Sequence, residues 1–222
     1  MSNEKIQSTY LKEVKERALE LAEIVKNKSN GNAILLPVTK GFGVEEVKAM
    51  LEVGLTQVGE SYAQEIIQKA QIINDNRIAW HMIGRVQSNK VRKLSETISL
   101  WHSVDRKDLI AEIYKRKNES KILIQVDLSN RSQQGGCSLE EVPELIEFAS
   151  SKGLKVDGLM TIGVDKDVEA TKRAFSRLAK LAESMGLREI SMGMSDDYEI
   201  AIDHGATILR VGRGIFGERA KK

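Results

Sequence analysis

The sequence contains little cysteine and histidine and lacks long apolar runs, and each of these scarcities excludes a class of protein. A single cysteine, Cys137, allows no disulfide within the chain, which fits the reducing cytosol, so we expect a cytoplasmic protein. With three histidines and this one cysteine, all well separated, a structural zinc site is not expected. No apolar run approaches the roughly 20 residues that a membrane-spanning helix needs, and the charged amino-terminal segment does not resemble a signal peptide.

The chain also lacks the basic excess of a general nucleic-acid-binding protein. Its 34 Lys and Arg residues and 32 Asp and Glu residues are interspersed and give a net charge of +2. A local basic cluster in residues 85–93 is interpreted as a solvent-exposed helix start. We therefore expect neither nucleic acid nor a membrane among the partners, and the hydrophobic fraction of 41% is sufficient for one sizeable core.

Patterns typical of strands and of helices alternate after an amino-terminal helix. Apolar residues at spacings of three and four predict that helix over residues 4–28, and Asn30-Gly31 is a typical stop signal. Short apolar runs then predict strands over 33–40, 57–60, 79–83, 98–104, 121–128, 156–162, 189–194 and 206–211. The helices predicted between them cover 44–53, 61–73, a segment beginning near 88, 107–117, 138–152, 168–185 and 196–204.

Eight strands that alternate with helices through short connections favour a closed parallel barrel. Right-handed strand–helix–strand units repeated in this way form a (β/α)8 barrel of the TIM type, so the predicted fold class is α/β with an extra N-terminal helix. A doubly wound open sheet is the alternative, but it usually has fewer strands. We expect a single domain over residues 1–222, with the helix in 1–30 and the barrel in 33–219. Pro37 lies inside the first strand, where it removes a ladder donor, so this strand is expected to be irregular.

The first predicted strand ends on a lysine. Lys40 closes the run 33–40 and is followed by Gly41 and Gly43. Because open α/β sheets and β/α barrels carry their functional residues at the carboxyl ends of strands, Lys40 is a candidate site residue. An amine at the mouth of an apolar barrel is partly desolvated, which lowers its pKa and suits it to form a Schiff base with an aldehyde. A solvated lysine in a turn is the alternative interpretation of this segment alone.

Two later segments are suited to binding an anion. Ser195-Asp196-Asp197 follows the seventh strand and opens a predicted helix, whose first backbone amides lack partners. Gly212-Arg213-Gly214 follows the eighth strand, and its glycines allow backbone amides to approach a ligand closely. TIM barrels often bind phosphate between strands seven and eight. Together with Lys40, these segments indicate a phosphorylated aldehyde held by its phosphate at one end and by an imine at the other.

Six segments of the chain match one protein family. They are Val38-Thr39-Lys40, Gly59 to Glu65, Trp80 to Lys90, Gly158-Leu159-Met160, Met192 to Asp197, and Arg210 to Gly217. In these segments the chain resembles the pyridoxal phosphate homeostasis proteins, whose fold is similar to the amino-terminal barrel of alanine racemase. The resemblance extends over about residues 33–219.

The resemblance implies that the chain binds pyridoxal 5'-phosphate (PLP) as a Schiff base on Lys40. It implies that Ser195 binds the phosphate together with backbone amides near Gly212 and Arg213. It also implies that Arg210 faces the pyridine nitrogen, as the matching arginine does in the related racemases. A guanidinium in that place disfavours protonation of the nitrogen by charge repulsion, so the ring becomes a weaker electron sink.

Other candidate residues depart from the family pattern or have a simpler alternative role. Ser61 stands where asparagine is usual, and its hydroxyl replaces an amide that could contact the cofactor. Gln134 stands where the family has a lysine linked to secondary cofactor handling. His81 and Met160 complete the predicted cofactor-binding set; the alternatives are a hydrogen-bonded barrel residue for His81 and core packing for Met160.

These observations favour a carrier that holds PLP for intracellular PLP homeostasis without committed turnover, and we expect no catalytic residues. The alternative is a PLP-dependent amino-acid racemase, which needs an acid–base group on each face of the substrate α-carbon. Alanine racemase takes one such group, a tyrosine, from a second domain, whereas this chain ends eleven residues after Val211. A cofactor-free aldolase that uses Lys40 would be colourless. We expect a monomer whose partners are PLP and PLP-dependent apoenzymes.

Overall fold

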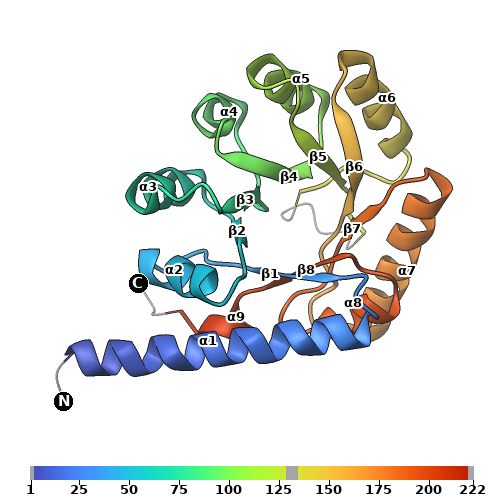
Figure 1. Cartoon of the computed structure of the whole chain (residues 1–222). Helices are drawn as coiled ribbons and strands as arrows, with labels where there is room; N and C mark the ends of the chain where they lie inside the picture. The colour runs from blue at the N-terminus through green and yellow to red at the C-terminus, as the bar shows by residue number, and fades with distance from the viewer. Residues whose placement is uncertain (1–2, 129–134, 220–222) are drawn as a thin grey trace.

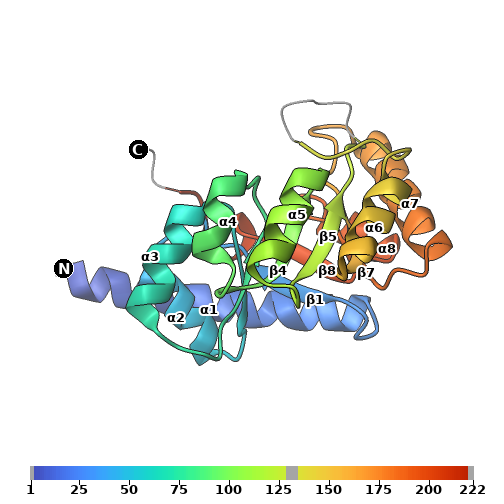
Figure 2. The ribbon, with the colours of Figure 1, turned by 90° about the horizontal axis from the view of Figure 1, so that it is seen from above.

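Short apolar runs that alternate with amphipathic helices produce a parallel sheet surrounded by helices (Figures 1 and 2). The computed structural model describes residues 3–128 and 135–219. The strands are β1 (Ile34–Pro37), β2 (Gln57–Glu60), β3 (Ala79–Met82), β4 (Ile98–Val104), β5 (Lys121–Gln125), β6 (Lys155–Met160), β7 (Glu189–Ser191) and β8 (Ile208–Val211). The helices are α1 (Asn3–Lys28), α2 (Val44–Glu52), α3 (Ala63–Ile73), α4 (Ser88–Leu94), α5 (Lys107–Arg116), α6 (Val142–Lys152), α7 (Val168–Ser184), α8 (Tyr198–Asp203) and α9 (Arg213–Phe216).

The sheet closes into a barrel because its first strand returns to its last. From β2 to β8, each strand pairs in parallel with the next, and β1 pairs with β8 from Ile34 opposite Ile208 to Pro37 opposite Val211. Between β1 and β2 the connection is a single parallel bridge, Val38 to Gly59. The predicted (β/α)8 barrel is therefore confirmed, and the open-sheet alternative is excluded for this chain.

Pro37 accounts for the weak pairing between β1 and β2. The Val38 N–H donates to Val211 O of β8 (2.9 Å), and the Thr39 N–H donates to Gly59 O of β2 (2.9 Å). Alternate residues of a strand face opposite neighbours, so the backbone nitrogen of Pro37 faces β2. Proline carries no hydrogen on that nitrogen, and a rung is lost there. The irregularity expected at this strand thus lies on its β2 side.

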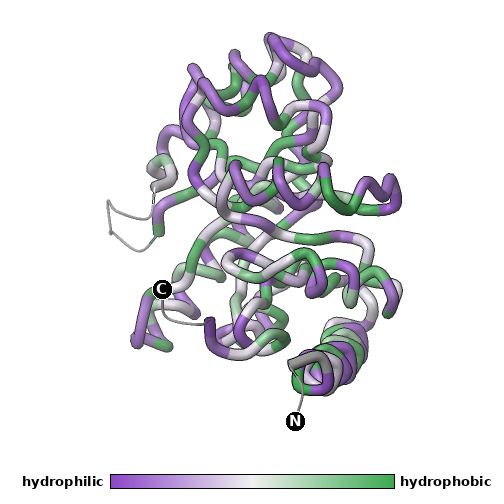
Figure 3. Tube along the Cα trace, turned by 90° about the vertical axis from the view of Figure 1, so that its left-hand side faces the viewer, coloured by the Kyte–Doolittle hydropathy of each residue, from purple (hydrophilic) through white to green (hydrophobic). Residues whose placement is uncertain are grey.

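Helix α1 lies outside the barrel and covers the region where the last helices are short. Because α8 has six residues and α9 has four, they cover little of the outer surface near β8 and β1. In Figure 1, α1 runs along the base of the view beside α2 and α9, and it also contacts β1. Its residues Val14, Ala18 and Val25 are buried, whereas Figure 3 shows hydrophilic positions on the same helix.

Two side chains of α1 hold α9 in place. The Tyr10 hydroxyl donates to Phe216 O (3.2 Å), and Arg17 Nε donates to Ile215 O (2.7 Å). These carbonyls belong to the last turn of α9, where no partner exists within the helix. The extra N-terminal helix thereby fixes the segment that immediately follows β8.

The hydrophobic core has two parts, as expected for a barrel surrounded by helices. The larger cluster joins the outward side chains of the strands to the inner faces of the helices. The smaller cluster fills the barrel and consists of Leu36, Leu100, Leu123, Met160 and Ile208, with Ile83 and Ile162 packed against it. The barrel interior is therefore a packed floor, above which the carboxyl ends of the strands are free to carry a site.

Several helix starts differ from those predicted. Helix α6 begins at Val142 rather than at 138, because Pro143 is placed in its first turn, where proline is tolerated. Ser138 and Glu141 have the spacing of a capping box, and the Ser138 N–H does donate to Glu141 Oε2 (2.8 Å), but within a turn that precedes the helix. The sequence interpretation did not include α9.

Candidate functional site

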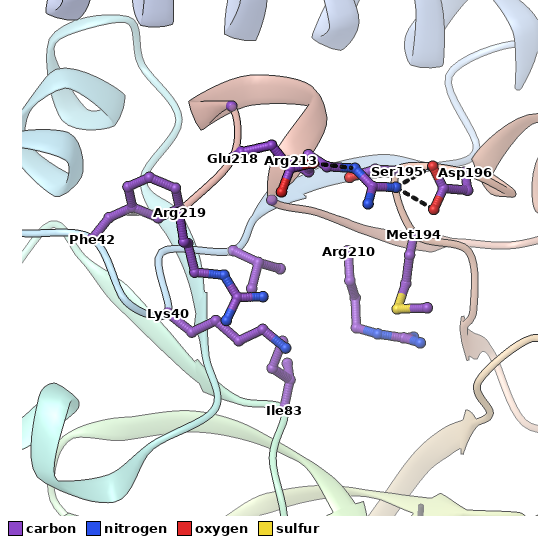
Figure 4. A pocket seen from close by; sticks show the side chains of 13 residues that line it. Lys40, Phe42, Ile83, Met194, Ser195, Asp196, Arg210, Arg213, Glu218 and Arg219 are labelled. Atoms are coloured by element: carbon purple, nitrogen blue, oxygen red, sulfur yellow. Dashed lines mark hydrogen bonds and ion pairs between the residues drawn. The ribbon is translucent and has the colours of Figure 1, made fainter. Parts of the chain in front are cut away.

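A cavity of about 230 Å³ opens at the carboxyl ends of the strands (Figure 4). Its wall is built from the segments that follow β1, β3, β7 and β8, as a barrel site requires. Five of the eight predicted cofactor-binding residues line it: Lys40, Ser195, Arg210, Gly212 and Arg213. Figure 4 shows Lys40 extended into the cavity from the side of β1, with Arg210 on the opposite side.

Lys40 provides a half-buried amine with a lowered pKa. Burial lowers the pKa of Lys40, and the positive charges of Arg219 and Arg210 lower it further, while Glu60 opposes the change. Within the described residues, no carboxylate or carbonyl holds the Lys40 ammonium. The amine is therefore easier to deprotonate than a surface lysine and is free to react with a carbonyl group.

A buried ionic cluster joins the end of β1 to the end of β2. Lys69 Nζ donates to Glu60 Oε2 (2.6 Å), Glu65 Oε2 (2.8 Å) and the backbone oxygen of Thr39 (2.8 Å). The side chains of Lys69 and Glu60 are 6% and 0% exposed. Because water is excluded, each charge in this cluster depends on its partners.

The same cluster fixes the backbone on both sides of Lys40. On one side, Thr39 O accepts from Lys69; on the other, the Gly41 N–H donates to Glu65 Oε2 (2.9 Å). These two bonds hold Lys40 between them, so the direction of its side chain is set by residues that do not line the cavity. We call Glu60, Glu65 and Lys69 the lysine clamp.

Arg210 is held by a hydrogen-bonded chain that crosses the barrel interior. Its Nη1 donates to Ser191 Oγ (2.7 Å) and its Nη2 donates to Thr161 O (2.8 Å). Ser191 Oγ lies 2.9 Å from His102 Nδ1, and His102 Nε2 lies 3.0 Å from His81 Nδ1. Burial lowers the pKa of Arg210 to about 10, so the guanidinium remains charged at neutral pH.

Arg210 fixes one end of this chain. Arg210 can only donate, so Ser191 Oγ accepts from it, and the hydroxyl keeps a hydrogen and a second lone pair with which to meet His102 Nδ1. His102 Nε2 and His81 Nδ1 share one hydrogen between them. Burial lowers the pKa of His81 to about 4 and that of His102 well below its usual value, so both rings are neutral at neutral pH.

An anion cradle lies opposite Lys40, between the segments that follow β7 and β8. The Gly214 N–H donates to Ser195 Oγ (3.1 Å), which leaves the hydroxyl hydrogen of Ser195 available for a ligand. A side chain at Gly212 would begin 3.1 Å from Val38 O, so glycine keeps this backbone close to β1. The cradle therefore offers a hydroxyl donor and closely placed backbone amides to an anion.

The start of the helix after β7 differs from the sequence prediction, in which its first backbone amides bind the anion. Helix α8 begins at Tyr198, with Asp197 at its N-cap, and Asp197 Oδ1 accepts from the Met194 N–H (2.5 Å). The helix start thus carries its own carboxylate, so the segment after β7 contributes the Ser195 hydroxyl to the cradle and the segment after β8 contributes the backbone amides. Arg213 pairs with Asp196 and, through Nε, with Glu218 Oε1 (3.5 Å).

Three predicted residues lie away from the cavity wall. His81 and Met160 are buried in the barrel below it, where His81 bonds to His102 and Met160 belongs to the inner hydrophobic cluster. Ser61 lies in the β2–α3 connection, where its N–H donates to Glu60 Oε1 (2.7 Å). Gln134 lies outside the described residues.

Several site residues were not identified from the sequence. Phe42, Glu218 and Arg219 line the cavity, and His102 and Ser191 complete the chain that holds Arg210. Gly217 ends the matched segment 210–217 and also lines the cavity, so it could have indicated that the residues after it lie there too. His102 and Ser191 gave no local signal, because their pairing depends on how β4 and β7 face each other across the barrel.

The described residues, 3–128 and 135–219, contain no group of three or more His, Cys, Asp or Glu side chains that could hold a metal ion. None of their helices combines the length and apolar character needed to cross a membrane.

The barrel and the site at the carboxyl ends of its strands are typical of barrels of the alanine racemase type, and comparison with known proteins gives the same class. Residues 14–220 match the family described as "Alanine racemase, N-terminal domain". An alanine racemase from Clostridium difficile has a TM-score of 0.73 at 14% identity, covering 92% of this chain and 58% of that one, which shows the shared fold alone.

Closer relatives identify the particular family. The chain is 38% identical to a pyridoxal phosphate homeostasis protein of Aquifex aeolicus, with 84% of this chain and 87% of the relative covered. It is 36% identical to one of Pseudomonas aeruginosa, with 83% and 84% covered. PipY of Synechococcus elongatus, solved with PLP bound, has a TM-score of 0.78 at 29% identity and covers 92% of this chain and 100% of its own. The chain belongs to the pyridoxal phosphate homeostasis protein family.

Proposed function

We propose that this protein binds PLP in the strand-end cavity, covalently attached to Lys40 as an imine, and holds it without committed turnover. One observation carries the proposal: a half-buried amine without a partner among the described residues faces an anion cradle across one cavity. The curated relatives are named for PLP homeostasis, and a related structure was solved with PLP bound. Both support the same role here.

The residues of the cavity fit the chemical groups of PLP. An aldehyde requires a nucleophilic amine, which Lys40 supplies, and a phosphate requires hydrogen-bond donors, which the Ser195 hydroxyl and the backbone near Gly212 and Arg213 supply. When bound, PLP supplies an electrophilic carbon and a ring that delocalises charge. The buried Arg210 contributes a fixed positive charge on the wall opposite Lys40. Ser61, His81 and Met160 remain predicted contacts that this geometry does not support directly.

The absence of committed turnover is supported by how the acidic groups of the cavity are engaged. Asp196 and Glu218 both pair with Arg213, so neither is free to act as a base. His81, the remaining candidate, is buried below the cavity with a pKa of about 4. We therefore propose a carrier in the cytoplasm, acting as a monomer and delivering PLP to apoenzymes, with the racemase as the alternative.

The attachment is tested by spectroscopy followed by mapping. Purified protein mixed with PLP should become yellow, and borohydride reduction should place the adduct on Lys40 by peptide mass spectrometry. A Lys48→Ala variant, which removes an exposed lysine of α2, should behave as the parent protein. A reduced adduct on another lysine would refute the assignment. A protein that stays colourless would favour the cofactor-free aldolase.

Turnover is tested by incubating the loaded protein with L-alanine and L-serine in deuterated water. We expect a constant optical rotation, because Lys40 is the only uncommitted base among the described cavity residues and serves one face of the α-carbon. We also expect slow exchange of the α-proton, because the charge of Arg210 disfavours protonation of the ring nitrogen and weakens the ring as an electron sink. Rapid exchange with loss of rotation would restore the racemase. A His81→Ala variant then shows whether that residue is the second base, since loss of the exchange would assign it.

A further inference from the structure

Arg219 reaches the cavity from the segment that follows α9. Its Cδ lies 2.8 Å from the point where a β-carbon on Gly41 would be, and Gly41 has a φ of +76°. Only glycine combines this backbone conformation with the space that Arg219 occupies. Figure 4 shows the guanidinium of Arg219 inside the cavity beside the Lys40 amine. The chain is thus shaped to bring a second cation next to Lys40.

Arg219 differs from the other arginines of the cavity because it has no partner in the part of the chain that the structure describes. Arg210 is bonded to Ser191 and Thr161, and Arg213 pairs with Asp196 and Glu218. Within the described residues, no carboxylate or carbonyl contacts the guanidinium of Arg219. Its charge also opposes protonation of Lys40. Two neighbouring cations without an anion form a site that an incoming negative group would stabilise.

The phosphate of the proposed cofactor already has a separate cradle. Ser195 and Gly214 lie with Arg213 at the other side of the cavity, where Figure 4 shows Arg213 directed toward Asp196 and away from Lys40. The anion that pairs with Arg219 must therefore belong to another molecule that comes close to Lys40. An α-amino acid carries an amine and a carboxylate one carbon apart, and a guanidinium binds a carboxylate through two parallel hydrogen bonds.

We propose that Arg219 binds the carboxylate of an amino acid that enters the cavity beside Lys40. This inference rests on the proposed function and names a ligand class for the loaded protein. The site then prefers amino acids over amines that lack a carboxylate, whether or not any reaction follows.

The test compares two probes that differ only in the carboxylate. L-alanine and ethylamine are titrated into PLP-loaded protein, and the change in the cofactor absorbance gives an affinity for each. The ratio of the two affinities is the measured quantity, because any effect on Lys40 or on the cofactor itself acts on both probes. We expect the parent protein to prefer L-alanine, Arg219→Gln to reduce the ratio about tenfold, and Arg219→Lys to retain part of it.

Two controls make the result specific. Arg173→Gln removes the same charge from the exposed face of α7 and should leave the ratio unchanged. Ser195→Ala should weaken PLP retention and leave the ratio unchanged. An unchanged ratio in Arg219→Gln, or PLP retention that falls instead of the ratio, would overturn the inference and assign Arg219 to the phosphate. A parent protein with no PLP absorbance would overturn the proposed function as well.

Discussion

Lys40 combines partial burial, nearby positive charge and the absence of an ion pair with any described residue, and these properties make a lysine nucleophilic. Replacing Lys40 by alanine should therefore remove the absorbance band that survives dialysis, because the imine cannot form. PLP should still bind reversibly through the cradle at Ser195 and Gly214. The check is the visible spectrum before and after dialysis, with Lys48→Ala as the matched control. A Lys40→Ala protein that keeps its colour would contradict the assignment.

Ser195 offers one hydroxyl hydrogen to an anion while its oxygen accepts from the Gly214 N–H. Ser195→Ala should weaken PLP binding about tenfold, since a hydrogen bond to a charged group contributes about 1.5–3 kcal/mol. The imine should still form, because Lys40 is unaffected. Affinity is measured by titration, with Ser151→Ala on the exposed face of α6 as the control. Equal affinities for the parent and Ser195→Ala would show that the hydroxyl only positions Gly214.

At the scale of elements, the lysine clamp connects the ends of β1 and β2 through buried charges. Lys69→Met should lower the free energy of unfolding by about 3 kcal/mol or more, because Glu60 is then left buried without its partner. Adding Glu60→Gln should recover part of that loss by removing the uncompensated charge. Urea unfolding measures both variants. A double variant no more stable than Lys69→Met would show that Lys69 acts by packing, not by charge.

The alternation of elements was predictable from the sequence because short apolar runs mark the strands and the longer helices carry apolar residues at spacings of three and four. The carboxyl-end positions of Lys40, Arg210 and Ser195 followed from that alternation, since a parallel barrel gathers those ends on one face. The start of α6 was placed too early because Pro143 decides it, and the capping pattern at Ser138 is satisfied within a turn. Helix α9 is too short for a periodic pattern.

Contacts between distant segments could not be predicted in the same way. The clamp was visible only as the pair Glu65 and Lys69, four residues apart on a helix, which usually indicates a solvent-exposed ion pair. Its burial depends on how α3 packs over the end of β1. His81 was placed in the ligand site because its motif was recognised, whereas its side chain turns toward His102 inside the barrel. Strand register, which decides this, has no local signature.

For the whole molecule, the neutral histidines of the barrel predict a pH dependence of stability. His81 has a pKa of about 4 in the folded protein and about 6.5 when exposed, so the unfolded chain binds more protons between these values. Stability should therefore be complete above about pH 6.5 and decline as the pH falls toward 4. At ~1.4 kcal/mol per pKa unit, His81 alone contributes on the order of 3 kcal/mol, and His102 acts in the same direction.

The measurement is the free energy of unfolding in urea at several pH values for the parent protein, His81→Asn and Ser151→Ala. The His81→Asn protein should show a shallower decline than the parent between pH 6.5 and 4. Ser151 is exposed on α6 and its hydroxyl does not titrate in this range, so its replacement should leave the decline unchanged. Identical slopes in the parent and His81→Asn would show that the buried histidines do not titrate on unfolding.

The rung that Pro37 removes has a consequence for the slow motions of the barrel. With one bridge at Val38 and Gly59, β1 can separate from β2 at the cost of fewer backbone bonds than its four-residue pairing with β8. The lysine clamp spans this gap, so the charges that orient Lys40 also keep β1 beside β2. Transient separation of the two strands should therefore weaken the binding of the cofactor at the same time. Hydrogen exchange of the Thr39 amide should become faster whenever Lys69 leaves the clamp.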